Sequence, residues 1–92
     1  MDSQVRRAVL EKIEGVISDS SDVKEIVERL QSVPVTHKAD FALGIALGRI
    51  YNSFHYQTRR TLKRNATEDE FGEFQEMVQK NVDAIRKSLS VQ

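Results

Sequence analysis

The fold is decided by one uninterrupted stretch in the middle of the chain, HKADFALGIALGRIYNSFHYQTRRTLKR, which spans residues 37–64. Nothing in it breaks a helix, and at about 1.5 Å per residue the helix reaches roughly 42 Å. Its first part, residues 41–50, is apolar on nearly every side, whereas its second part is amphipathic. An all-round apolar helix is a buried helix, so we expect this one at the centre of the molecule.

Three further helices are predicted around it, over residues 3–17, 22–32 and 68–89, because apolar residues recur there at three- and four-residue steps. The short loops favour antiparallel neighbours. We therefore expect a single all-α domain over residues 1–92, an antiparallel four-helix bundle with a long central third helix. The first two helices are too short to cover the third, so we expect its second half to lean mainly on the fourth helix.

The predicted helix ends carry residues that are suited to capping. We expect N-caps at Ser3, at Ser21 or Asp22, and at Thr36, capping boxes at Asp22–Glu25 and Thr67–Glu70, and a left-handed C-cap at Asn65.

Charge is balanced overall, with 14 basic and 14 acidic residues, but it is unevenly distributed. Residues 37–65 carry six bases and one acid, whereas the segments before and after them carry net charges of −2 and −3. Overall neutrality argues against a chain devoted wholly to binding nucleic acid. It leaves room for a local basic face on the long helix.

Composition also narrows the classes of function. Without cysteine, the chain has no disulfide and no thiolate metal site. It has no GxSxG elbow and no phosphate-binding glycine loop, so we expect no enzyme and no cofactor. No apolar run approaches the roughly 20 residues that span a bilayer, and the first residues lack the pattern of a secretory signal. We therefore expect a soluble, cytoplasmic protein without a membrane partner.

The second half of the long helix carries a basic face. When the helix is wound at about 3.6 residues per turn, the five bases between residues 49 and 64 fall within a sector of about 140°. Tyr56 shares that sector, whereas Tyr51 and Phe54 lie on the opposite side and are expected in the core. We predict a partner-binding face made of Arg49, Asn52, Ser53, Tyr56, Arg60, Lys63 and Arg64.

This face has two interpretations. Arginines around a tyrosine bind phosphates or an acidic protein segment, which makes the chain a non-enzymatic binding or assembly module for an acidic protein or a nucleic acid. Alternatively, the face is solvated, and its bases pair with the acids at the start of the fourth helix, which are Glu68, Glu70, Glu73 and Glu76. No DNA- or RNA-binding motif matches the chain.

The acidic turn between the first two helices provides an alternative function. Asp19, Asp22 and Glu25 gather oxygen ligands of the kind that calcium prefers, although their spacing does not match an EF-hand loop. Helix capping explains the same residues without a cation. The two histidines, His37 and His55, lie about 27 Å apart on a continuous helix, which is too far for one zinc ion.

Two glycines on the long helix, Gly44 and Gly48, lie one turn apart. Small residues at this spacing let another backbone approach closely. We expect tight packing inside the bundle, and the alternative is a purely structural homodimer that forms through Gly44 and Gly48.

Overall fold

The computed structural model describes residues 1–90, and over this range it is all-α, with no strand. Its helices are α1 (Ser3–Ser18), α2 (Ser21–Arg29), α3 (Lys38–Leu62) and α4 (Glu68–Leu89). All four predicted helices are confirmed. The largest difference in bounds lies at the end of α2, which stops at Arg29 rather than at residue 32.

The N-cap of α1 is Asp2, whereas we predicted Ser3. The Asp2 carboxylate accepts hydrogen bonds from the backbone N–H groups of Gln4 and Val5, at 2.9 and 3.2 Å. One carboxylate thereby satisfies two of the N–H groups that have no partner within the helix.

At α2 the N-cap position is occupied by Ser20, so the predicted caps and the Asp22–Glu25 capping box are wrong. Asp22 already lies inside the helix, two residues after the N-cap position. The Ser20 hydroxyl instead donates a hydrogen bond to the backbone oxygen of Ser88 in α4, at 2.8 Å. This bond ties the start of α2 to the end of α4.

The ends of α3 also differ from the prediction. His37 and not Thr36 is at the N-cap position, without a side-chain capping bond. The left-handed C-cap is Lys63, with φ of 60°, rather than Asn65. Asn65 instead accepts a hydrogen bond from the Arg59 guanidinium at 2.7 Å. The Thr67–Glu70 capping box at the start of α4 is confirmed.

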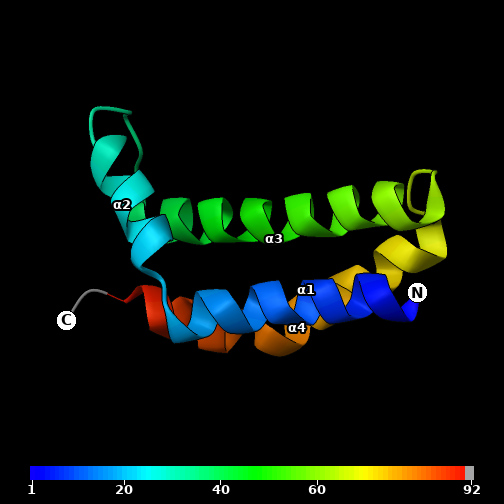
Figure 1. Ribbon diagram of the computed structural model, residues 1–92. Helices are drawn as coiled ribbons and strands as arrows, with labels where there is room; N and C mark the ends of the chain where they lie inside the picture. The colour runs from blue at the N-terminus through cyan, green and yellow to red at the C-terminus, as the bar shows by residue number, and fades with distance from the viewer. Residues whose placement is uncertain (91–92) are drawn as a thin grey trace.

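The helices form a bundle in which α1 and α4 lie side by side along one face of α3 (Figure 1). Both run opposite to α3 and parallel to each other. At one end of the bundle, Arg86 of α4 pairs with Asp40 of α3 at 3.2 Å, and the Ser88 hydroxyl of α4 donates to the Val16 backbone oxygen of α1 at 3.3 Å. The short α2 crosses the start of α3. The antiparallel bundle with a long central third helix is therefore confirmed.

The core lies on the inner face of α3 and extends along it from Leu43 to Thr58. Its fully buried side chains include Val5, Val9, Ile13, Val23, Ile50, Phe54 and Ile85. We had expected the second half of α3 to lean mainly on α4. That expectation is wrong, because α1 begins beside the end of α3 and runs back along it (Figure 1).

The two glycines of α3 are not packed inside the bundle, which corrects our prediction. Gly44 and Gly48 are both exposed, and a Cβ atom added at either would meet no atom within 4 Å. Neither has a positive φ, so neither is required by backbone geometry.

Candidate functional site

The outer side of the second half of α3 presents the predicted basic face to solvent. Tyr56 is 56% exposed, which makes it the most exposed large hydrophobic side chain among residues 1–90. Asn52, Arg60 and Lys63 are exposed around it, and Ser53 is half-buried. Asn52, Tyr56 and Arg60 thus lie on one side of α3, and Lys63 follows at its C-cap.

Two of the four bases on the predicted face form ion pairs. Within residues 1–90, the only ion pair between the face and an acid of α4 joins Arg64 to Glu70, with nitrogen and oxygen 2.7 Å apart. Over the same range, Arg60 and Lys63 form no ion pair and no side-chain hydrogen bond. The alternative in which the acids of α4 neutralise the face therefore holds for one base only.

Arg64 belongs to the clamp that closes the α3–α4 turn. Its guanidinium binds both carboxylate oxygens of Glu70, at 2.7 and 3.2 Å. Glu70 also accepts the backbone N–H of Thr67 in the capping box. These bonds, with Arg64 as the main cause, lower the pKa of Glu70 from 4.5 to about 2 and raise the pKa of Arg64. Arg64 is thus engaged inside the chain.

Arg49 lies apart from the other bases. It is half-buried, its guanidinium is 3.7 Å from the Asp22 carboxylate of α2, and it lines a pocket of about 220 Å³ between α1, α2 and α3. About 10 Å of helix separates it from Tyr56. We therefore restrict the candidate site to Asn52, Tyr56, Arg60 and Lys63, and add Arg59, an exposed base of the same sector whose guanidinium also donates to Asn65. These five residues are called the basic face from here on.

The carboxylates of the predicted calcium site are not gathered. Asp19 accepts the Ser21 backbone N–H at 3.0 Å, and hydrogen bonding from the Ser21 side chain and from this N–H lowers the pKa of Asp19. Asp22 faces Arg49, and Glu25 pairs with Arg29 at 3.0 Å. Across residues 1–90, no three acidic or histidine side chains are placed to hold one metal ion.

An aromatic cluster connects α3 with α4 beside the basic face. Phe54 stacks on Phe74, with ring centroids 4.6 Å apart, and is buried as predicted. Tyr51 contacts the Phe71 ring at 5.8 Å, but both of these rings are 41% exposed. Our placement of Tyr51 in the core is therefore wrong, because its ring covers the outer edge of the cluster.

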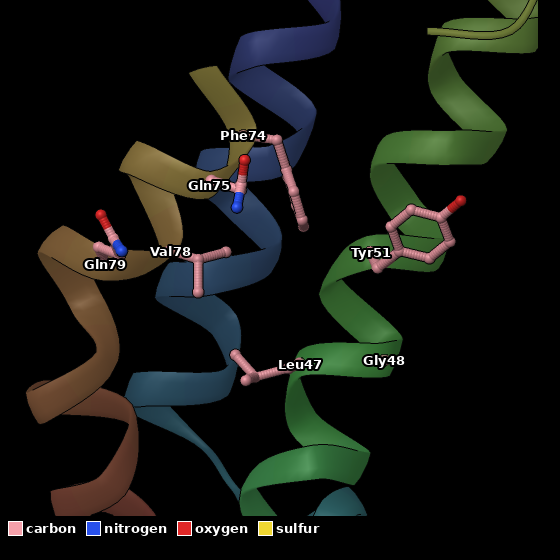
Figure 2. Close-up of a pocket in the computed structure, with 7 residues that line it drawn as sticks. All are labelled: Leu47, Gly48, Tyr51, Phe74, Gln75, Val78 and Gln79. Atoms are coloured by element: carbon pink, nitrogen blue, oxygen red, sulfur yellow. The ribbon is translucent and has the colours of Figure 1, made fainter. Parts of the chain in front are cut away.

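The exposed edge of this cluster borders a groove of about 450 Å³ between α3 and α4 (Figure 2). Its lining is apolar apart from two glutamines, and comprises Leu47, Gly48, Tyr51, Phe74, Gln75, Val78 and Gln79. Sequence reasoning missed this groove because it forms only where two helices meet. The available signal was the pair Gln75 and Gln79, polar residues one turn apart beside an apolar stripe.

Comparison with known proteins does not assign a family. No protein-family model, curated protein or solved structure matches the chain. Within residues 1–90, no helix has the length and the apolar character needed to cross a membrane.

Proposed function

We propose that this chain is a non-enzymatic binding module that holds an acidic segment of a partner protein on the basic face. The observation that carries the proposal is the solvent-exposed group of Tyr56, Arg60 and Lys63, whose bases have no acidic partner within the described residues 1–90. Arginine and tyrosine are the residue types that contribute most to protein interfaces. Charge-assisted hydrogen bonds from the bases orient the acidic segment around the tyrosine ring.

A protein partner is favoured over a nucleic acid by the charge of the whole chain. Fourteen acids balance fourteen bases, so no net positive charge attracts a long phosphate backbone to the chain as a whole. The basic face itself is one helix side with a single exposed ring, which offers one stacking surface rather than the series that single-stranded nucleic acids use.

The test is a titration of a labelled peptide rich in aspartate and glutamate, followed by fluorescence anisotropy. The Arg60→Glu, Lys63→Glu double variant should bind it about tenfold more weakly or worse, because attraction becomes repulsion at two positions. Lys80→Glu makes the same type of charge change on an exposed residue of α4 and should bind like the unmodified chain.

Two results contradict the proposal. One is equal binding of the acidic peptide by the double variant and by Lys80→Glu. The other is tighter binding of duplex or single-stranded nucleic acid at the same salt concentration, which would make the basic face a phosphate-binding surface.

A further inference from the structure

We propose that the acidic partner segment is an amphipathic α-helix, and that its apolar side docks into the α3–α4 groove while its acidic residues reach the basic face. This inference rests on the proposed function, because the basic face selects the charge of the partner. It adds a second contact surface, the groove, and a conformation for the ligand.

The residues that line the groove are spaced one helical turn apart. Its lining residues come in pairs one turn apart: Leu47 with Tyr51 on α3, and Phe74 with Val78 and Gln75 with Gln79 on α4. An amphipathic helix presents its anchors at the same three- and four-residue steps, which is the basis of helix-in-groove recognition. Residues 1–90 contain no strand, so an extended peptide would find no sheet edge there.

The arrangement of the long helices leaves a place for one more. Of the four helices of residues 1–90, α1, α3 and α4 form the body of the bundle, and the short α2 covers only the start of α3 (Figure 1). A helix in the α3–α4 groove would pack on both of its neighbours, as in a four-helix bundle of full-length helices.

Gly48 gives the partner helix room. It forms the α3 rim of the groove, and the space beside its Cα is open, with no atom within 4 Å of an added Cβ. Gly44, one turn earlier, has the same open space. A partner backbone can therefore approach α3 more closely here than a rim with side chains would allow.

The bases beside the groove indicate which charge the polar side of the partner helix carries. The groove lining itself contains no charged residue. On α3, however, Asn52 and Arg59 lie four and eleven residues after Gly48, which places them on the same side of the helix, so the rim of the groove continues directly into the basic face. A helix that lies along this rim brings its flank beside the bases, and only acidic residues on that flank are complementary to them.

Three peptides separate the two surfaces. The first is an amphipathic helix of leucine, alanine and glutamate. The second has the same composition in a scrambled order, so that it is acidic but not amphipathic. The third is the amphipathic helix with lysine in place of glutamate. We expect the first to bind at least about tenfold more tightly than either of the others, and to shift the NMR signals of the Leu47 and Val78 methyl groups.

The matched variants are Gly48→Leu and Gly15→Leu. Both glycines are exposed with no atom near an added Cβ, so both variants should fold, which circular dichroism checks. Gly48→Leu fills the rim of the groove and should weaken binding of the amphipathic acidic helix about tenfold. Gly15→Leu, on α1, should leave binding unchanged.

Three outcomes overturn the inference, and they are distinguishable. If the scrambled acidic peptide binds as well as the helix and Gly48→Leu has no effect, the groove is not used, although the proposed function of the basic face stands. If the lysine peptide binds as well as the glutamate peptide, the basic face does not distinguish acidic from basic partners, and the proposed function fails as well. If sedimentation shows a dimer of the chain alone that Gly48→Leu dissociates, a second copy occupies the groove.

Discussion

The two halves of α3 share one inner face but differ on their outer sides. The inner face is buried from Leu43 to Thr58, and α1 and α4 pack against it. The outer side of the first half carries the exposed glycines Gly44 and Gly48, whereas that of the second half carries Tyr56 and the unpaired bases. The inner face therefore determines stability, whereas the outer side is available for binding because folding does not use it.

The largest effect on stability is expected from a substitution that disrupts the inner face. Phe54→Ala removes a fully buried ring that stacks on Phe74, and it should lower the free energy of unfolding by about 3–5 kcal/mol. Denaturant unfolding measures this loss. Tyr51→Ala is the control, since its ring belongs to the same cluster but is 41% exposed, and it should cost clearly less. Equal losses would show that the distinction between inner and outer sides is wrong.

The clamp at the end of the second half is expected to have the next largest effect. Glu70→Gln loses the ion pair with Arg64 and weakens the capping box, so it should lower the free energy of unfolding by about 1–2 kcal/mol at neutral pH. Glu68→Gln, which changes an exposed acid of the same turn, is the control.

Because of the same clamp, we expect the stability of the chain to depend on pH. In the folded chain the pKa of Glu70 is lowered to about 2. The stabilisation of the fold by ionised Glu70 is therefore fully present above the ordinary pKa of 4.5, and it is lost as the pH falls through about 2. The stability difference between the unmodified chain and Glu70→Gln should therefore shrink between pH 4.5 and pH 2. A difference that stays constant over this window would contradict the assigned cause.

A smaller effect, with the opposite sign, is expected in the first half. Gly44→Ala and Gly48→Ala should each raise the free energy of unfolding by up to about 1 kcal/mol, because alanine favours the helix and its methyl group meets open space. Thermal unfolding measures the gain. Tight packing at these glycines would instead make both variants less stable.

Much of the fold was predictable because it depends on local patterns. The helical period fixed all four helices, and the Thr67–Glu70 capping box marked the start of α4 correctly. The N-cap of α1 was missed by one residue, because Asp2 and Ser3 are both good caps and the sequence does not say which one lies outside the helix.

The site was predictable only in part, and for a physical reason. Winding the helix placed Tyr56 and the bases on one side without any knowledge of the neighbouring helices. Which bases are neutralised depends on the position of α4 and on the α3–α4 turn, so the pairing of Arg64 with Glu70 could not be distinguished from other pairings. The α3–α4 groove was missed because two helices form it together.

The smallest effect on stability is expected on the basic face itself. Arg60→Glu should change the free energy of unfolding by no more than about 0.5 kcal/mol, because Arg60 is exposed and has no partner within residues 1–90. Arg64→Glu, four residues further along and past the end of α3, should cost more, since it replaces an ion pair with repulsion against Glu70. Denaturant unfolding of both variants at low and high salt measures the contrast, which salt should reduce. If Arg60→Glu destabilises the chain as much as Arg64→Glu does, then Arg60 stabilises the fold, and the basic face is not a surface that folding leaves available for a partner.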